Sequence, residues 1–405
     1  MFTVRTMSIT TRQRVFFHLG SPKTGTTYLQ EVLWRNREPL RRAGLLYPGD
    51  RPEAHFQAAM DLQGTQFQAD WEDADVPSAW RKLVEQARQF SGDVVLSHEL
   101  FCTAAPEDVE RAMSDLAFAE VHVVCTARDL ARQLPAVWQE DVKNRHVVSF
   151  SDFSAGVRGG EGRSHWLSEL FWQRQDLPAI LRKWAVGLPP ERVHVVTVPR
   201  PDEGPSRLWE RFACLIGVDP GSFDAQVGSP NKSLGVAETA LLSRLNETLA
   251  DRLDWPGYDS VVKYQLATEI FGARASRRRI ALPAEDRPWV QDRAKQLVSE
   301  LSTAAYDVVG DLDELLPATS RHSGAHDHPD DVEDREVLET AIEALGAVLE
   351  RHAELERATA AQASSTRKQR LRGLCARNVL LRKLYRCARA RIAPARSSRW
   401  VPRGG

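Results

Sequence analysis

The stretch from residue 15 to residue 34 constrains the fold more than any other part of this chain. The apolar run at 15–19 is typical of a buried strand, and residues 28–34 carry apolar side chains at helical spacing. Between them lies the octet Gly-Ser-Pro-Lys-Thr-Gly-Thr-Thr at 20–27. A strand, a glycine-containing loop and a helix start direct backbone N–H groups and the positive helix end at one point. The stretch therefore predicts an anion site, most often for phosphate, with Lys23 adding a full positive charge.

The octet differs from a Walker A loop. That pattern ends in Gly-Lys followed by Ser or Thr, whereas Lys23 precedes Gly25 and no nearby Asp is placed to hold magnesium. An ordinary strand-to-helix turn with a solvated lysine is the alternative for any single feature of the loop. The complete octet, with the hydroxyl donors Thr26 and Thr27, favours the anion site.

Three further valine-rich runs, at 93–97, 121–126 and 193–198, also have the character of buried strands. They lack alternation and are separated by helical patterns, which is typical of a parallel sheet covered on both faces. We therefore expect an α/β fold with three layers. The predicted helices extend to residue 42 after the loop and then cover 80–90, 106–118, 130–145, 176–188, 205–217, 236–253, 258–275 and 286–306, with a kink or late start at Pro135.

Polar side chains follow three of these strands. Parallel α/β sheets bind ligands at the carboxyl ends of their strands. Lys23, the pair His98 and Glu99, and Arg128 all fall at such ends. We expect these groups to meet at one edge of the sheet.

The run Pro-Lys-Thr-Gly-Thr-Thr at 22–27 resembles the 5′-phosphosulfate loop of sulfotransferases that use 3′-phosphoadenosine 5′-phosphosulfate (PAPS). The resemblance covers about residues 12–310 and implies the P-loop-like three-layer fold of that family. It implies that Lys23 neutralises the bridging and leaving oxygens. It also implies that the loop residues Thr24, Gly25, Thr26 and Thr27 bind the 5′-phosphate, and that no metal is needed.

The segment Thr-Ala-Arg-Asp at 126–129 looks like the 3′-phosphate motif of the same family, which implies that Arg128 binds that phosphate. The family places a Ser eight residues after the Arg, where this chain has Ala136. An Arg at this point can also form a structural ion pair. The candidates to take the place of the missing Ser are Arg132, Lys143, Asn231, Lys232 and Ser233, of which we favour Ser233.

In this family the general base is commonly a His or a Glu at the second strand end. The resemblance therefore implies His98 or Glu99 and does not decide between them; we favour Glu99, and either residue could instead cap the next helix. His55 is a third candidate, although a lone His in a loop is usually solvated.

The acceptor is expected to offer a hydroxyl or an amine, on a small molecule, carbohydrate or lipid. Its pocket is expected near residues 49–77, interpreted as an insertion or lid, and the glycine-rich segment 150–165, interpreted as a mobile loop. The side chains singled out for this pocket are His55, Phe101, Trp138 and His165.

The C-terminal part differs in charge from the rest. Of 54 Lys and Arg residues, 13 fall in 366–405, which contains none of the 55 Asp and Glu residues. We therefore divide the chain into five segments. They are a disordered N-terminus (1–14), the sulfotransferase domain (15–316), a linker (317–331), a charged helix (332–361) and a basic amphipathic tail (362–405). The helix either pairs as a coiled coil, through apolar residues at Leu338, Ile342, Leu345 and Leu349, or stands alone. The tail either contacts an anionic membrane or is disordered.

Composition narrows the remaining classes. A chain with 42% hydrophobic and 27% charged residues is typical of a globular protein. The first 14 residues lack the apolar block of a signal peptide, and no run approaches the roughly 20 residues of a membrane span. The five cysteines form no Cys-x-x-Cys pair, which argues against zinc and for buried free thiols. We expect a cytoplasmic enzyme, with contact to the inner membrane face through the tail, and no nucleic-acid partner.

Two other functions stay open. A nucleotide kinase-like P-loop enzyme would need magnesium, and the position of Lys23 argues against it. A membrane-peripheral nucleotide-binding protein without catalysis is compatible with Ala136.

Overall fold

The computed structural model describes residues 12–68, 71–159, 165–204, 206–227, 233–274, 278–318 and 328–377. The chain divides into two units, Met1–Ala341 and Ile342–Gly405, which are described separately. Most of the predicted N-terminal segment 1–14 lies outside the described residues. Its last residue does not, because Arg14 opens the first strand and its guanidinium lies 2.5 Å from Asp93.

A parallel sheet forms the centre of the first unit. Its strands in the described part of the chain are β1 (Arg14–His18), β2 (Leu45–Leu46), β3 (Asp93–Ser97), β4 (Glu120–Ala127), β5 (Val193–Thr197) and β6 (Asp307–Val309). They are ordered β2-β3-β1-β4-β5-β6, and every pairing is parallel. The predicted fold class and the strands β1, β3, β4 and β5 are confirmed. The short edge strand β6 was not predicted.

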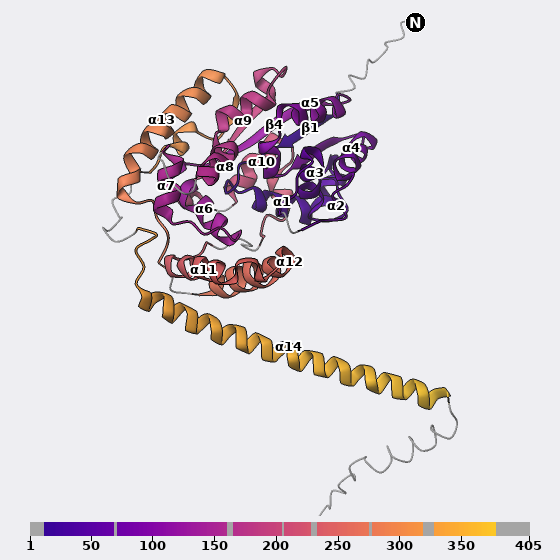
Figure 1. Cartoon of the computed structure of the whole chain (residues 1–405). Helices are drawn as coiled ribbons and strands as arrows, with labels where there is room; N and C mark the ends of the chain where they lie inside the picture. The colour runs from indigo at the N-terminus through magenta and orange to yellow at the C-terminus, as the bar shows by residue number, and fades with distance from the viewer. Residues whose placement is uncertain are drawn as a thin grey trace, which may run out of the picture. The chain divides into compact units, whose positions relative to one another are not determined.

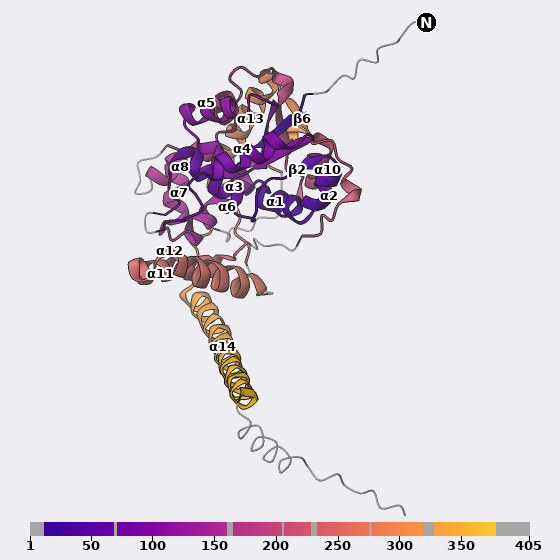
Figure 2. The same cartoon turned by 90° about the vertical axis from the view of Figure 1, so that its right-hand side faces the viewer.

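Helices lie on both sides of the strands (Figure 1, Figure 2). The α-helices are α1 (Thr26–Arg35), α2 (Arg37–Arg42), α3 (Ala54–Gln63), α4 (Ala79–Gln89), α5 (Pro106–Asp115), α6 (Leu130–Lys143), α7 (Phe150–Val157), α8 (His165–Gln175), α9 (Leu177–Trp184), α10 (Arg207–Leu215), α11 (Val236–Leu249), α12 (Trp255–Tyr258), α13 (Arg287–Ala304) and α14 (Asp334–Arg377). A π-helix, η6 (Asp259–Phe271), continues α12, and short 3₁₀ turns include η1 (Glu99–Thr103) after β3.

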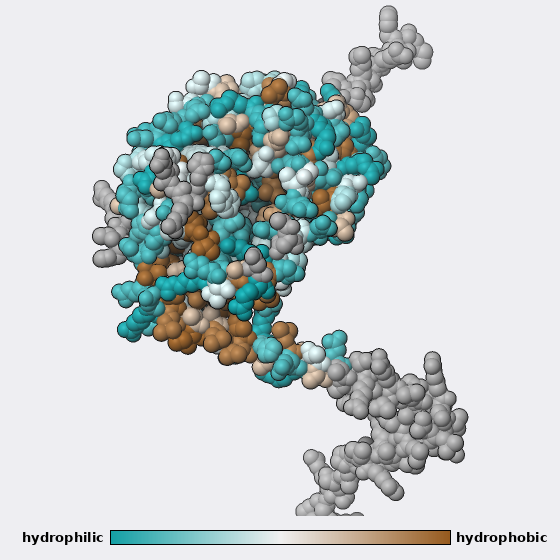
Figure 3. Space-filling model, in the orientation of Figure 1, coloured by the Kyte–Doolittle hydropathy of each residue, from teal (hydrophilic) through white to brown (hydrophobic). Residues whose placement is uncertain are grey.

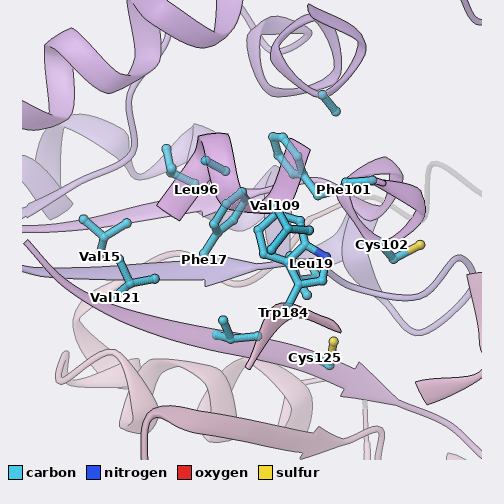
Figure 4. Close-up of a cluster of buried hydrophobic side chains, with 14 of the residues drawn as sticks. Val15, Phe17, Leu19, Leu96, Phe101, Cys102, Val109, Val121, Cys125 and Trp184 are labelled. Atoms are coloured by element: carbon cyan, nitrogen blue, oxygen red, sulfur yellow. The ribbon is translucent and has the colours of Figure 1, made fainter. Parts of the chain in front are cut away.

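Alternate side chains of β1 enter two separate cores. Val15 and Phe17 belong to one core, with side chains of α4, α5 and α9, whereas Phe16 belongs to the other, with α1, α2 and α10. The Phe17 ring meets the rings of Phe101 and Trp184 edge-on, each at 4.8 Å between centroids (Figure 4). The sheet is therefore covered on both faces, as a parallel sheet requires.

Several predicted segments differ in the structure. The helix expected to run to residue 42 breaks at Asn36. There the side-chain amide of Asn36 donates to the backbone carbonyls of Val32 and Asp224, each at 2.8 Å. The expected lid at 49–77 contains helix α3. The expected mobile loop at 150–165 is largely helix α7, whose first amides donate to the carboxylate of Asp330. Helix α6 begins at Leu130 and includes Pro135, so the late start was wrong.

The described part of the second unit is a helix, the portion of α14 from residue 342 to residue 377. The predicted bound of the charged helix, residue 361, was therefore too short. Ile342, Leu345 and Leu349 expose about three fifths of their surface, so the predicted seam faces outward. Most of the basic tail, residues 378–405, lies outside the described residues.

The face of the molecule drawn in Figure 3 is largely hydrophilic. Most of its described residues are teal, with a brown area at the beginning of α14. No helix among the described residues has the length and apolar character needed to cross a bilayer. Cys102 and Cys125 are buried free thiols, whereas Cys214, also free, is exposed.

Candidate active site

The loop after β1 contains three residues with positive φ: Gly20 at 56°, Lys23 at 68° and Gly25 at 86°. A Cβ atom on Gly20 would lie 2.3 Å from the Thr26 side chain. A Cβ atom on Gly25 would lie 2.4 Å from Leu208. Only glycine fits at both positions. Lys23 pays about 1 kcal/mol for its left-handed conformation, and backbone strain of this kind concentrates at functional sites.

The loop leads into the N-terminus of α1, where Gly25 is the N-cap residue and no side chain caps the helix. The first hydrogen bond of the helix runs from the Leu29 amide to the Gly25 carbonyl, at 3.1 Å. The amides that precede it point out of the helix end. Together with the helix dipole they suit the anion that the sequence predicts here.

Thr24 does not fit its expected role. Its hydroxyl donates to the Ser21 carbonyl at 2.5 Å and lies 2.6 Å from the Thr126 hydroxyl oxygen. Its amide also donates to Ser21, at 3.3 Å. Both donors are used inside the loop, so Thr24 stabilises the loop and we no longer regard it as a phosphate ligand.

A buried histidine joins the ends of three strands. Nδ1 of His18 on β1 lies 2.8 Å from the Ser97 hydroxyl on β3, and Nε2 lies 3.3 Å from the Thr126 hydroxyl on β4. Burial lowers the pKa of His18 to about 4, so the ring is neutral at pH 7. Because Thr126 also contacts Thr24, this network connects the loop to both neighbouring strands.

We expect His18 to make the protein sensitive to mild acid. Its pKa is lower in the folded state than in the unfolded state, so the unfolded state takes up the proton first as the pH falls below about 6.5. Between pH 6.5 and pH 5 this proton uptake lowers the free energy of unfolding by about 2 kcal/mol. Asp141, whose pKa burial raises to about 7, acts in the opposite direction. The measurement is therefore the difference in urea denaturation between wild type and His18→Gln at pH 7.5 and pH 5. Equal pH dependence in both proteins would contradict the assignment.

Lys23 forms an ion pair with Glu140, which lies on α6. The peptide bond before Lys23 is also held in place, because the side chains of Gln133 and Gln175 both donate to the Pro22 carbonyl, the latter at 3.1 Å. The Lys23 ammonium thus has a carboxylate partner within the protein.

Glu140 lies among several cations. Lys263 is 3.3 Å away and Lys143 is 3.9 Å away, in addition to Lys23. Burial alone would raise the pKa of Glu140, but the three ammonium groups hold it well below its usual value. Glu140 is therefore ionised at neutral pH. It occupies a position whose surroundings strongly favour negative charge.

Arg128 lies beside the loop, as expected. Its Nη1 donates to the Lys23 carbonyl at 3.1 Å, while Nε is buried without a hydrogen-bond partner among the described residues. Arg132, one turn along α6, bonds Asp129 and the Pro199 carbonyl, and its Nη2 is likewise buried without a described partner. Burial, with help from Arg132, lowers the pKa of Arg128 to about 10. Two buried N–H groups without partners suit an anion that binds here.

The other candidates for the second phosphate contact are placed only in part. Asn231 and Lys232 lie outside the described residues. Ser233 is exposed, and its neighbour Leu234 is tied to α6 by two hydrogen bonds with Gln139, at 2.9 and 3.0 Å. These hydrogen bonds hold the backbone next to Ser233 against Gln139, which lies three residues after Ala136 on α6. Lys143 is largely buried beside Glu140.

His98 and Glu99 end the strand β3 on the same edge of the sheet. Nδ1 of His98 accepts a hydrogen bond from the Leu100 amide at 3.1 Å, so the neutral ring carries its proton on Nε2. Glu99 accepts from Gln30 of α1 at 3.2 Å and from the Thr26 side chain. Burial alone would raise the pKa of Glu99, but His98 and these hydrogen bonds lower it. The Glu99 carboxylate is therefore ionised at neutral pH.

The residues expected around the acceptor pocket are mostly structural. His55 lies on α3, where its ring nitrogens contact the Pro48 carbonyl at 2.8 Å and the Ser97 amide at 3.2 Å. Both nitrogens are used, so His55 is not kept as a candidate base. Phe101 and Trp138 are buried in the protein interior. His165 begins α8, and its side chain is not described.

Comparisons with known proteins add little to this geometry. No protein-family model and no curated protein sequence matches the chain. Among solved structures, the chain is similar to the sulfotransferase domain from the curacin biosynthetic pathway, with a TM-score of 0.32 and 12% identity over 74% of this chain and 99% of that domain. A similarity this low carries no argument, so the function rests on the site itself.

Sequence reasoning missed three polar residues that shape the site: His18, Glu140 and Lys263. His18 looks like part of an apolar strand, and Glu140 looks like a solvated helix residue. The sequence held only a weak signal for this part of the site. One face of α6 carries, at helical spacing, Gln133, Ala136, Glu140 and Lys143. Among the described residues, no group of three His, Cys, Asp or Glu side chains is placed to hold a metal ion.

Proposed function

We propose that the protein is a sulfotransferase that moves a sulfuryl group from PAPS to a hydroxyl or amine of an acceptor. The observation that carries the proposal is the convergence of three groups at one edge of the sheet. Lys23 lies in an uncapped helix-start loop, Arg128 donates to the Lys23 carbonyl, and Glu99 is bonded to α1 through Gln30. An anion site, a second cation and an ionised carboxylate are the parts that such a transfer needs.

The donor would be held by its two phosphate groups. The amides at the start of α1, from Gly25 to Thr27, suit the 5′-phosphate. The buried N–H groups of Arg128 and Arg132 suit the 3′-phosphate, with Ser233 as a further contact. Arg132 therefore joins Ser233 as the proposed replacement for the missing Ser at position 136.

The transfer is an in-line displacement. The acceptor oxygen bonds to sulfur while the bond from sulfur to the 5′-phosphate oxygen breaks, and the acceptor proton passes to Glu99. Negative charge grows on the departing phosphate, where the Lys23 ammonium neutralises it. The products are the sulfated acceptor and adenosine 3′,5′-bisphosphate. Catalysis by position and charge needs no covalent intermediate with the protein.

Glu99 is the proposed base because His98 already uses Nδ1 as an acceptor. The proton on Nε2 of His98 makes that nitrogen a donor, suited to bind the acceptor oxygen or a sulfuryl oxygen. The two residues thus have different proposed roles: Glu99 removes the proton and His98 positions the reacting atoms.

The function is tested by incubating the protein with ³⁵S-labelled PAPS and fractionated cell extracts, with EDTA present. We expect label in an acceptor whose mass rises by one sulfo group. Transfer of phosphate from ATP that requires magnesium, with no sulfate transfer, would instead support the kinase-like alternative. Nucleotide binding without any transfer would support a non-catalytic protein.

Arg128→Ala is expected to weaken adenosine 3′,5′-bisphosphate binding about tenfold to a hundredfold, because charge-assisted hydrogen bonds to the 3′-phosphate are lost. Binding of adenosine 5′-monophosphate should change little. The two affinities are measured by calorimetry, with Arg81→Ala, an exposed position on α4, as the matched control. Equal losses for both nucleotides would remove Arg128 from the 3′ site.

Glu140→Gln is expected to tighten adenosine 3′,5′-bisphosphate binding about fivefold to tenfold. The substitution removes the carboxylate that competes with the ligand for Lys23, an effect on the order of 1 kcal/mol for a partly exposed pair. The same calorimetric titration measures it. Weaker binding would mean that Glu140 helps to build the site and does not compete with the anion.

The C-terminal part enters the proposal in two ways. The exposed apolar residues of α14 would pair with another helix, and the basic tail would contact an anionic membrane surface. Both ideas rest on the sequence pattern, and the tail beyond residue 377 lies outside the described residues.

A further inference from the structure

The end of α3 and the segment between α3 and α4 line a half-open cavity of about 370 Å³ that the proposed transfer does not use. The volume falls in the range of small-molecule sites. Its walls include Met60, Phe67, Trp71, Glu72, Asp73 and Val76. The described lining residues all come from positions 60–77, part of the segment expected to lie over the loop.

Aromatic contacts connect this cavity with the proposed base. Phe56 of α3 lies between them: its ring centroid is 6.0 Å from that of Trp71 and 5.5 Å from that of Phe67. The same ring is 5.5 Å from His98, at the end of β3. One ring therefore separates the walls of the cavity from the strand end that carries the proposed base.

A second set of contacts connects the cavity with the Lys23 ion pair. Phe67 lies 5.3 Å from Trp255, and the Lys263 ammonium lies 5.6 Å from the Trp255 ring. Lys263 in turn contacts Glu140, the partner of Lys23. Packed side chains thus link the lining of the cavity to His98 on one side and to the Lys23 ion pair on the other, so the cavity lies next to the proposed reaction centre.

The charge of the lining is one-sided. Among the lining residues that the structure describes, Glu72 and Asp73 are acidic and no Lys, Arg or His is present. Asp73 is engaged by the Gln57 amide at 2.7 Å and the Asp75 backbone N–H at 2.9 Å. Glu72 is exposed and makes no hydrogen bond or ion pair within the part of the chain that the structure describes. A carboxylate beside aromatic rings disfavours an anionic ligand and attracts a cation.

We propose that this cavity binds the non-reacting end of the acceptor, and that this end carries a positively charged nitrogen. The proposal rests on the proposed function, because it names the class of acceptor for the same site. Trp71 and Phe67 provide cation–π contact, Glu72 provides the opposite charge, and the reacting hydroxyl or amine extends past Phe56 toward Glu99.

The test compares choline with its uncharged isostere 3,3-dimethylbutan-1-ol, using the full chain saturated with adenosine 3′,5′-bisphosphate. Binding is followed by saturation-transfer NMR of the ligand methyl groups. Choline should bind about twofold to fivefold more tightly than the isostere, which is the expected scale of an exposed cation–π contact. Methyl α-glucoside serves as a neutral sugar probe and should bind more weakly than choline.

Variants locate the binding. Glu72→Gln should remove most of the preference for choline, and Trp71→Leu should weaken choline itself. Glu110→Gln, an exposed glutamate on α5, should leave both unchanged. Equal binding of choline and the isostere, tighter binding of the glucoside, or an undiminished preference in Glu72→Gln would each overturn the proposal. These failures leave sulfate transfer from PAPS intact, whereas failure of the proposed function abolishes that transfer, with or without loss of bisphosphate binding.

Discussion

Lys23→Ala is expected to reduce sulfate transfer from labelled PAPS by about a thousandfold, the upper range for loss of one preorganised charge-stabilising group. The reason is that Lys23 carries the ammonium group of the loop, which can neutralise the negative charge that develops on the leaving phosphate. Folding should be preserved, because alanine takes the place of a partly exposed side chain and the backbone keeps its conformation. The measurement is a single-turnover assay with saturating donor.

The matched control is Lys82→Ala, which removes an exposed ammonium on α4 far along the chain from the loop. Thermal unfolding of both variants separates loss of catalysis from loss of structure. Retention of most activity in folded Lys23→Ala would refute the role given to Lys23. Loss of activity accompanied by unfolding would be resolved by Lys23→Gln, which keeps a polar, unbranched side chain of nearly the same length without the charge.

Glu99→Gln is expected to lower turnover by about a hundredfold to ten-thousandfold, the usual contribution of a general base. The amide keeps the shape of the carboxylate and can still bond Gln30, but it cannot accept the acceptor proton. Bisphosphate affinity should stay unchanged, since the lost function concerns the acceptor. The readout is the rate of transfer at saturating donor across a pH series.

His98→Gln provides the comparison. A glutamine can retain a hydrogen bond to the reacting atoms, so we expect a smaller loss in this variant than in Glu99→Gln. The opposite order would exchange the two roles and make His98 the base. Normal turnover in both variants would place the base elsewhere in the site.

The order of residues along the chain was enough to predict the sheet and the loop. Valine-rich runs at β3, β4 and β5 can be recognised because strands buried on both faces carry near-continuous apolar residues. The octet after β1 can be recognised because its glycines and lysine follow a strand directly. The meeting of Lys23, Glu99 and Arg128 at one edge then follows from the geometry of parallel strands.

Other features depend on contacts between distant segments. The pairing of Lys23 with Glu140 requires α6 to lie against the loop, and no local pattern encodes that placement. Thr24 looks like a ligand in the sequence, yet its hydroxyl is used by Ser21 and Thr126. Sequence alone cannot separate a hydroxyl that binds a phosphate from one that holds a loop.

Local composition also hid two helices. Helix α3 is buried on most of its surface, so its residues lack the one-sided apolar pattern of a surface helix. Helix α7 contains Gly156 and precedes three more glycines, a composition that favours a loop. Its first turn is instead stabilised by the distant carboxylate of Asp330. The strand β6 has too few residues for any period to show.

The account depends on an anion site at the start of α1 that recognises a nucleotide with phosphates at both the 3′ and the 5′ positions. Isothermal titration of the folded full chain with adenosine 3′,5′-bisphosphate, without added metal, tests this most directly. We expect saturable binding of one ligand per chain, tighter than that of adenosine 5′-monophosphate. Absence of binding heat at several temperatures, or equal affinity for the two nucleotides, would contradict it.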